Sequence, residues 1–358
     1  MTAEETLDPQ KLMTTTMNVA GLFRSAYVSM MVLLGLRLGL YRTLSDAGPV
    51  TSEELARRTE LHERWLREWL RGQAAAGLIE YKGDGRFELS PECAVLLADE
   101  NDLRYMGNHF DSLPRRIETA QQLPESFRTG IGQTWDGRGS DSAEVTERLF
   151  RNWYLQMLVP VALPMLDGAL ARLVAGAKVA DVGCGAGIAL IEMAKAFPDS
   201  EFHGYELSEN AITRAEANRD EAGTDNVSFH NVAGDPLPAD ERFDLITTFD
   251  CLHDMTQPGQ VAAAIRAAIR PDGLWFIVDI NGAATFEENL TNPLTSMMYA
   301  MSVLGCLSSA LSEPDGAGLG TLGLPEPAMR ELAREAGFTR FRRLDLPHPV
   351  NAFYEVRP

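Results

Sequence analysis

The sequence predicts an α/β fold, in which a mostly parallel β-sheet with helices on both faces follows a mainly helical domain. Two observations lead to this prediction. After residue 178, short apolar segments alternate with helical patterns, which is typical of a parallel sheet. Before residue 110, apolar residues recur at helical spacing. We therefore expect three parts, with bounds 1–110, 111–175 and 176–358.

The N-terminal part is predicted to be a winged helix. Thr51 can cap a first helix, and a second helix carries Trp65 and Trp69. Segments 78–81 and 87–89 flank a Gly-Asp-Gly turn, which predicts a two-stranded wing. Helix, helix and wing follow one another in the order of a winged-helix domain.

The most apolar stretch of the chain is residues 26–41. It is shorter than the roughly 20 residues that a membrane-spanning helix needs, and Arg37 interrupts it. We therefore expect a buried helix and no membrane partner. The helices around Phe23, Met30 and Leu34 are too apolar to stand in water alone, so we predict a two-fold homodimer formed mainly by the N-terminal part.

Charge and cysteine usage narrow the function classes. The formal net charge of −19 argues against general affinity for nucleic acid, and mildly against a highly anionic substrate. The cysteines are scattered and form no C-x-x-C pair, so they indicate neither a zinc site nor a disulfide framework and suit a cytoplasmic protein. The four positions are Cys93, Cys184, Cys251 and Cys306.

The remaining two parts divide into a helical connector and the sheet. The connector carries one loop, residues 128–142, which is rich in Gly, Ser and Asp. The predicted parallel strands are 178–183, 201–206, 227–233, 243–249 and 273–280, and a closing antiparallel pair is predicted at 338–348 and 352–357.

A glycine-rich turn follows the first strand. Asp181 lies near the strand end, and Gly183, Gly185 and Gly187 come at alternate positions before a helix. Glycine allows a tight turn and a close approach of the backbone to a ligand. Position 188 is Ile, where the dinucleotide fingerprint has Gly or Ala, and no Lys-Ser/Thr pair forms a phosphate loop.

Acidic groups follow at the ends of the next strands. Glu206 ends the second strand, where a carboxylate can accept both hydroxyls of an adenosine ribose. Asp235 follows the third strand and is placed for an adenine amino group, and Asp250 follows the fourth. Carboxyl ends of parallel strands are where open α/β sheets bind ligands, so these groups predict one site.

Together these motifs resemble the ordered motifs of class I S-adenosylmethionine-dependent methyltransferases. The matching segments are DVGCGAG, the strand-ending Glu, GD after the third strand and RPDG before the fifth, over residues 178–280. The N-terminal part resembles the dimerisation domain of small-molecule O-methyltransferases, and the tail resembles an actinobacterial subgroup. The resemblance implies a seven-stranded, mostly parallel, Rossmann-like sheet and S-adenosylmethionine as cofactor, with S-adenosylhomocysteine as product.

Carried over to this sequence, the resemblance implies a role for each motif. Gly183 and Gly185 would line the methionine end of the cofactor, Glu206 would hold its ribose and Asp235 its adenine. The Phe249–Asp250 segment would hold the amino group. The complete set of candidate cofactor-binding residues is Asp181, Gly183, Gly185, Gly187, Glu206, Leu207, Gly234, Asp235, Phe249 and Asp250.

His253 and Asp254 are the candidate catalytic residues. The family's general base is a His in an L-H-D-W segment, and this chain has Met255 in place of the Trp. A histidine with a pKa near about 6.5 can take a proton from a hydroxyl at neutral pH, and Asp254, or a carboxylate elsewhere, could orient it. The pair could instead cap a helix or contribute to a metal site, but no second His is placed to complete one, so no metal is predicted.

The predicted function is methyl transfer from S-adenosylmethionine to a small hydroxylated, apolar or aromatic metabolite, typical of secondary metabolism. One alternative is a methyltransferase-like enzyme that uses the cofactor without methyl transfer, such as a decarboxylase, hydroxylase or cyclase. Another is a regulator that senses the cofactor and binds DNA through the winged helix. The chain lacks a Lys/Arg-rich recognition helix, which favours dimerisation over DNA binding.

Overall fold

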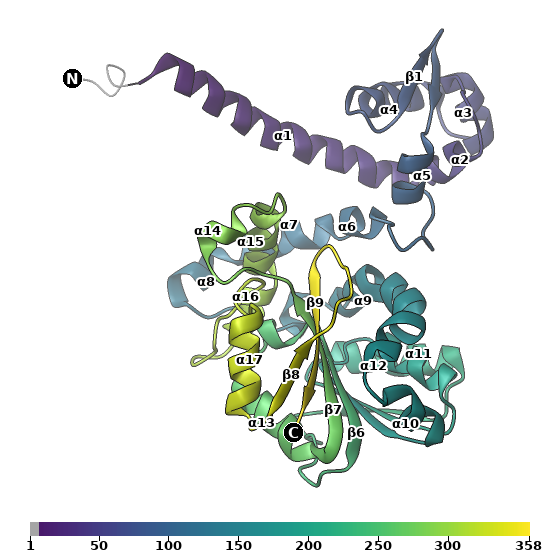
Figure 1. The fold of residues 1–358 in the computed structure, drawn as a ribbon. Helices are drawn as coiled ribbons and strands as arrows, with labels where there is room; N and C mark the ends of the chain where they lie inside the picture. The colour runs from purple at the N-terminus through teal and green to yellow at the C-terminus, as the bar shows by residue number, and fades with distance from the viewer. Residues whose placement is uncertain (1–6) are drawn as a thin grey trace. The chain divides into compact units, whose positions relative to one another are not determined.

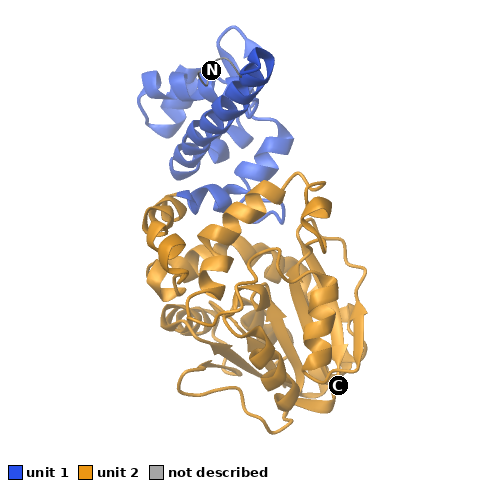
Figure 2. Ribbon diagram, turned by 90° about the vertical axis from the view of Figure 1, so that its left-hand side faces the viewer, with its two compact units in different colours: residues 1–113 blue, residues 114–358 orange. Residues whose placement is uncertain are grey.

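A computed structural model describes residues 7–358, which divide into two compact units, residues 7–113 and 114–358 (Figure 1, Figure 2). The first six residues of the predicted N-terminal domain lie outside the described residues. The predicted connector, residues 111–175, lies almost entirely in the second unit.

Unit 1 is a helical domain with a two-stranded wing. Its elements are α1 (Pro9–Arg37), α2 (Leu40–Ser45), α3 (Ser52–Thr59), α4 (Glu63–Ala75), β1 (Glu80–Gly83), β2 (Arg86–Glu88), α5 (Pro91–Leu97) and α6 (Gly107–Asp111). Thr51 caps α3 in a capping box with Glu54, as its position before the helix predicts. In the core of this unit, the Trp69 ring packs edge-on against Tyr41, and its indole N–H donates to Met31 O at 2.9 Å.

The apolar N-terminal stretch is more exposed than the sequence predicts. It belongs to the 29-residue helix α1, in which Val32 and Gly35 are buried. Within the predicted stretch, residues 26–41, Tyr27 is 57% exposed and Leu34 is 51% exposed, so the expectation of a buried helix is wrong for this part of the single chain. By length and apolar composition, α1 would suffice to cross a membrane, as would a bent helical pair spanning residues 142–175.

Unit 2 begins with helices and continues with alternating strands and helices. The helical part comprises α7 (Leu113–Gln122), α8 (Pro124–Thr129), α9 (Ser142–Trp153), a π-helix (Tyr154–Ala162) and α10 (Ala169–Ala175). The alternating part comprises β3 (Lys178–Val182), α11 (Ile188–Ala196), β4 (Glu201–Glu206), α12 (Glu209–Ala222), β5 (Val227–Asn231), β6 (Phe243–Phe249), α13 (Pro258–Ala268) and β7 (Ile269–Ile280). The chain ends with α14 (Phe286–Asn289), α15 (Thr295–Leu304), α16 (Cys306–Ala310), α17 (Glu326–Glu335), β8 (Arg340–Arg343) and β9 (Asn351–Arg357).

The strands of unit 2 form one seven-stranded sheet in the order β5-β4-β3-β6-β7-β9-β8 (Figure 1). β3 to β7 are parallel, and β9 pairs antiparallel with both β7 and β8. This arrangement confirms the predicted mostly parallel, Rossmann-like sheet. The strand order reverses between β3 and β6, and open α/β sheets bind their ligands beside such a reversal.

Apolar side chains cover both faces of this sheet. On one face, α10, α11 and the π-helix bury residues such as Leu158 and Met193. On the other face, α13 and α17 bury residues such as Ile265 and Met329. With both faces buried, the strands read as continuous apolar runs, which is why they were visible in the sequence.

One strand boundary differs from the prediction. β7 begins at Ile269, so the Arg-Pro-Asp-Gly segment lies within the strand, where the register with β6 shifts between Phe243 and Leu245. Gly273 lies at this irregularity, and a Cβ there would come within 3.0 Å of Phe243 O. The turn chemistry of the segment therefore produces a bulge that β6 accommodates.

Candidate functional site

The glycine-rich turn links β3 to α11 with three left-handed residues. Gly183, Gly185 and Gly187 have φ values of 74°, 53° and 76°, a region that favours glycine. A Cβ on Gly187 would come within 2.4 Å of the Phe229 ring, so that glycine serves packing. A Cβ on Gly185 would meet no atom within 4 Å. Gly185 is therefore the glycine of this turn that faces open space.

Backbone donors from the turn and from its own loop hold the Glu206 carboxylate. Oε2 accepts from the backbone N–H of Gly185 at 3.0 Å. Oε1 accepts from the N–H groups of Leu207 at 2.8 Å and Ser208 at 2.9 Å. Burial raises the pKa of Glu206, although these three hydrogen bonds oppose the rise. A carboxylate has about four acceptor positions, so Glu206 retains capacity for a further donor.

Two more predicted carboxylates lie at the ends of β3 and β6. Asp181 is 2% exposed and accepts a 2.7 Å hydrogen bond from Thr247 Oγ1. Asp250 has a left-handed φ of 51° and accepts from the Asn351 side chain. Burial raises the pKa of each carboxyl to about 7. Desolvated carboxylates of this kind favour a cationic ligand.

His253 lies in a short 3-10 turn after β6, where it pairs with a carboxylate from β7. Its Nδ1 is 2.5 Å from Asp279 Oδ1, and both side chains are almost fully buried. An ionised carboxylate only accepts hydrogen bonds, so Nδ1 carries the hydrogen and Nε2 is the nitrogen available as a base. Burial alone lowers the pKa of His253, but the negative charge of Asp279 raises it well above its ordinary value.

Of the two possibilities left open by the sequence, Asp254 or a carboxylate elsewhere, the hydrogen bond to Asp279 favours the second. Asp254 is 7% exposed, and burial raises its pKa to about 7, while the charges of His253 and Arg138 oppose the rise. Asp279 is an acid inside the apolar run of β7, but nothing in the sequence places it beside His253. Within residues 7–358, no three His, Cys, Asp or Glu side chains are grouped as metal ligands.

The sequence analysis missed Tyr154, the first residue of the π-helix. Burial raises its pKa well above the ordinary value, and the nearby charges of Asp250 and Asp181 add to the rise. Its ring packs edge-on against Phe249 at 5.5 Å. π-Helical turns are frequent at functional sites, but the connector sequence gives no local sign that this Tyr lies beside the strand-end carboxylates.

Of the remaining predicted residues, Asp235 and Leu207 are exposed, and Phe249 is part of the hydrophobic core. Asp235 has a side-chain exposure of 68%, and its Oδ2 is 2.7 Å from His230 Nδ1. Leu207 is 61% exposed, and a Cβ on Gly234 would meet no atom within 4 Å. By contrast, Phe249 is 7% exposed and its side chain belongs to the core beneath the site.

The loop before α9 contacts both the loop after Glu206 and the turn between α15 and α16. Asp136 accepts from Ser208 Oγ and, at 3.0 Å, from the backbone N–H of Glu209, directly after the Glu206 loop. Two residues later, Arg138 Nη2 donates to Gly305 O at 2.6 Å, just before α16. A single short segment thus contacts both the Glu206 loop and the α15–α16 turn.

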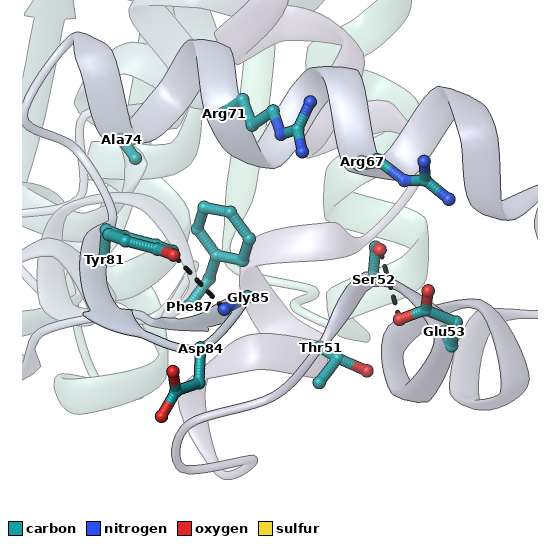
Figure 3. Close-up of a pocket in the computed structure, with 10 residues that line it drawn as sticks. All are labelled: Thr51, Ser52, Glu53, Arg67, Arg71, Ala74, Tyr81, Asp84, Gly85 and Phe87. Carbon is teal, nitrogen blue, oxygen red and sulfur yellow. Dashed lines mark hydrogen bonds between the residues drawn. The ribbon is translucent and has the colours of Figure 1, made fainter.

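A surface pocket in unit 1 lies between α3, α4 and the wing (Figure 3). It contains none of the predicted site residues. The Tyr81 hydroxyl accepts from Gly85 N–H at 3.2 Å, and Arg67 forms a 2.7 Å ion pair with Glu63. Its lining residues are Thr51, Ser52, Glu53, Arg67, Arg71, Ala74, Tyr81, Asp84, Gly85 and Phe87. Two basic and two acidic side chains balance one another in this lining.

Two family models match the chain. Residues 173–320 match a methyltransferase domain, and residues 26–99 match an Rv2258c-like winged HTH domain. A ubiquinone biosynthesis O-methyltransferase of Ralstonia nicotianae is 34% identical over 135 residues, which are 37% of this chain and 53% of that protein. One of Leptothrix cholodnii is 28% identical over 129 residues, 36% of this chain and 54% of that protein. The chain thus spans about half the length of these relatives.

Solved structures resemble the whole chain at low sequence identity. An O-methyltransferase family protein from Burkholderia thailandensis has a TM-score of 0.66 at 16% identity, covering 96% of this chain and 98% of that one. Human N-acetylserotonin methyltransferase in complex with SAM has a TM-score of 0.66 at 15% identity, covering 100% and 99%. At such identities the likeness establishes the fold.

The match over residues 173–320 identifies a methyltransferase domain within unit 2. This chain combines a C-terminal methyltransferase domain with an N-terminal Rv2258c-like winged-helix domain. The predicted Rossmann-like fold and the predicted methyltransferase and winged-helix domains are confirmed. The predicted cofactor agrees with the SAM in the human neighbour's structure.

Proposed function

We propose that this chain is an O-methyltransferase that transfers a methyl group from S-adenosylmethionine to a small hydroxylated, apolar or aromatic metabolite, with His253 as general base. The observation that carries the proposal is the buried His253–Asp279 pair, 2.5 Å apart, at the ends of β6 and β7. Its place beside the glycine turn and Glu206 brings a proton acceptor to the edge of the sheet where the cofactor motifs lie.

The residues at this edge fit S-adenosylmethionine. Asp181 and Asp250 are buried carboxylates whose pKa burial raises to about 7, so a cation stabilises their ionised forms. The cofactor brings an ammonium and a sulfonium, and Glu206 retains acceptor capacity for ribose hydroxyls. Gly185 leaves open space above the turn. Asp181, Gly183, Gly185, Gly187, Glu206, Leu207, Gly234, Asp235, Phe249 and Asp250 would form the cofactor site.

The chain contributes orientation and proton removal. When bound, S-adenosylmethionine supplies a methyl group that is already activated, so the protein mainly aligns the acceptor hydroxyl and removes its proton. Asp279 holds the His253 ring and stabilises its protonated form, which leaves Nε2 to receive the hydroxyl proton. Asp254 remains a candidate catalytic residue through its charge, near both His253 and Arg138.

The test is a product analysis with a panel of phenolic and hydroxylated metabolites. The purified protein with S-adenosylmethionine should yield S-adenosylhomocysteine and a product heavier by one methyl group in equal amounts. Cofactor binding without any methylated product, together with another conversion of the acceptor, would favour the alternative of a methyltransferase-like enzyme that does not transfer methyl.

A DNA-binding regulator is the weaker candidate. In a winged helix, α4 would enter the groove, yet two of its three arginines are paired with glutamates on the helix surface. Arg64 lies 2.5 Å from Glu68, and Arg67 lies 2.7 Å from Glu63. With the net charge of −19, this pairing supports a winged helix that does not bind nucleic acid. A salt-sensitive shift of specific DNA would contradict this view.

The exposed face of α1 supports a homodimer of a cytoplasmic protein. Phe23, Tyr27, Met30 and Leu34 recur at helical spacing along α1, and each is 45% exposed or more. A stripe of this length is larger than soluble monomers usually leave open. We expect a dimer mass by light scattering at micromolar concentration. A stable monomer, or a protein extracted only with detergent, would contradict this assembly.

A further inference from the structure

Three basic side chains of unit 2 converge on one thiol beside the proposed base. The thiol belongs to Cys306, the first residue of α16. The His253 imidazole lies close enough to this thiol to interact with it. The guanidinium groups of Arg116 and Arg138 both lie close enough to interact with it electrostatically. Carboxylates lie near the same groups, because Asp279 pairs with His253 and Asp254 interacts with Arg138.

The Arg138 side chain is buried, but one of its guanidinium nitrogens has no hydrogen-bond partner. It is 7% exposed, its Nη2 donates to Gly305 O at 2.6 Å, and its guanidinium lies 4.4 Å from the Trp135 ring centre. Its Nε has no hydrogen-bond partner. Burying a charged donor without a partner is costly, and native proteins rarely leave such a group unsatisfied.

A second unsatisfied group borders the same cluster. Thr321 is 3% exposed, and its hydroxyl has no hydrogen-bond partner. Its backbone N–H donates to Ser302 Oγ at 3.0 Å, on the helix that leads into the Gly305 turn. The preceding Gly320 donates its N–H to His253 O at 3.1 Å. Unpaired polar atoms therefore occur on two segments, one that contacts the Gly305 turn and one that contacts His253, which is expected where a polar ligand completes the hydrogen bonding.

The charges are distributed unevenly across the site. The ends of β3, β4 and β6 present carboxylates, while the α15–α16 side presents the two guanidinium groups. Burial lowers the pKa of Arg138, the charge of Asp254 opposes this change, and the positive charge of Arg116 adds to it. An anionic group would be repelled by the strand ends and attracted to the arginines. One side of the site therefore favours a cationic group of a ligand, and the other side favours an anionic group.

We propose that Arg138 and Arg116 form an anion subsite next to His253, so that the methyl acceptor carries a carboxylate in addition to the hydroxyl that is methylated. A planar guanidinium matches a carboxylate in geometry as well as in charge. This inference rests on the proposed function, because it assigns the substrate class of the same site. The net negative charge of the chain argues only mildly against it, since the subsite recognises one charge through local groups.

The experiment compares two probes that differ in charge and little in shape, 3-hydroxybenzoate and 3-hydroxybenzamide. Their affinities for the protein saturated with S-adenosylhomocysteine are measured by calorimetry. We expect the carboxylate to bind at least about tenfold more tightly, because a buried charge-assisted hydrogen bond is lost with the amide. Arg138→Gln should abolish this preference, and Arg138→Lys should retain part of it.

Two further variants control for folding and for general electrostatics. Arg116→Gln should reduce the preference while leaving the Arg138–Gly305 hydrogen bond in place. Arg148→Gln removes an arginine from α9 that is 38% exposed and lies 3.0 Å from Glu144, and it should leave the preference unchanged.

Equal affinity for the two probes, or a loss in Arg138→Gln that is the same for both, would overturn the anion subsite and leave Arg138 as a residue that fixes the loop. In either case, normal binding of S-adenosylhomocysteine keeps the proposed function intact. If the unmodified protein did not bind S-adenosylhomocysteine at all, the proposed function would fall, and the subsite with it.

Discussion

The two sides of the site in unit 2 are built in different ways. On the proposed cofactor side, most of the site consists of backbone groups close together in sequence. These are the turn from Gly183 to Gly187 and the N–H donors around Glu206. On the acceptor side, side chains meet from distant parts of the chain, as in the Arg138–Gly305 hydrogen bond between residues 167 positions apart. A site made of local backbone suits a ligand that never changes, whereas one made of distant side chains can change its specificity by single substitutions.

The largest expected effect is on the acceptor side. His253→Ala should lower turnover about 10²- to 10⁴-fold while leaving cofactor affinity nearly normal, because the base acts on the acceptor and not on the cofactor. Steady-state kinetics with a methylated acceptor, together with calorimetry of cofactor binding, measure both quantities. Full turnover of the variant between pH 6 and 9 would make His253 a structural residue and would remove the division of labour between the two sides.

The cofactor side should give the reverse result. Glu206→Ala should weaken S-adenosylmethionine binding by about 1.5–3 kcal/mol, or roughly ten- to a hundredfold, because the ribose loses its acceptor and the turn loses the hydrogen bond to Gly185. Turnover at saturating cofactor should change less than affinity. Glu209→Ala, on the exposed first turn of α12, is a matched control. Unchanged affinity in Glu206→Ala would refute the assignment.

A smaller effect tests the link between His253 and Asp279. The charge of Asp279 raises the pKa of His253, so activity should increase with pH through that raised value, where the imidazole becomes neutral. Asp279→Asn removes the charge, so the pH–rate profile should move to lower pH by about one unit or more, with a maximal rate lower by about tenfold. An unshifted profile would mean that another group limits the rate.

The smallest effect is on stability. Asp181, Asp250 and Asp254 have pKa values of about 7 in the folded protein, against an ordinary value of 3.8, and burial is the main cause. The folded state therefore holds more protons than the unfolded state between these values, so stability falls as pH rises from 5 to 8. His253, with its raised pKa, contributes stability that is lost in the same direction at higher pH.

We expect Tm of the ligand-free protein to fall by roughly 4–8 °C between pH 5.5 and 8 in scanning fluorimetry. S-Adenosylmethionine should reduce this fall, because its cations stabilise the ionised carboxylates. A Tm that rises over the same range would contradict the burial of these acids without compensating charge.

The same contrast explains what the sequence could predict. The succession of strands and helices along the chain, the glycine turn and Glu206 could be predicted. Each depends on local patterns of apolar residues, glycine and acids. His253 was readable as a residue, but its partner was not, because Asp279 meets it only after β6 and β7 pair. Arg138 and Cys306 left no local signal, since tertiary packing alone brings them together.

The exposure of α1 could not be predicted from the sequence either. Periodicity predicts which residues share a helix face, but not whether another element of the same chain covers that face. Leu22 and Phe23 remain exposed because α2, α4 and α6 pack mainly against the C-terminal part of α1, where Val32 and Gly35 are buried.

The short segment from Asp136 to Arg138 bears on the order of events in turnover. One of its ends accepts hydrogen bonds from the first turn of α12, and the other holds Gly305 O. We therefore expect a shift of the Glu206 loop to affect the acceptor side through these three residues. Such coupling is reciprocal, because whatever factor the first ligand adds to the affinity of the second, the second adds to the first. If the coupling is positive, release of the methylated product would weaken the binding of S-adenosylhomocysteine. The methylated product would then leave first and S-adenosylhomocysteine second.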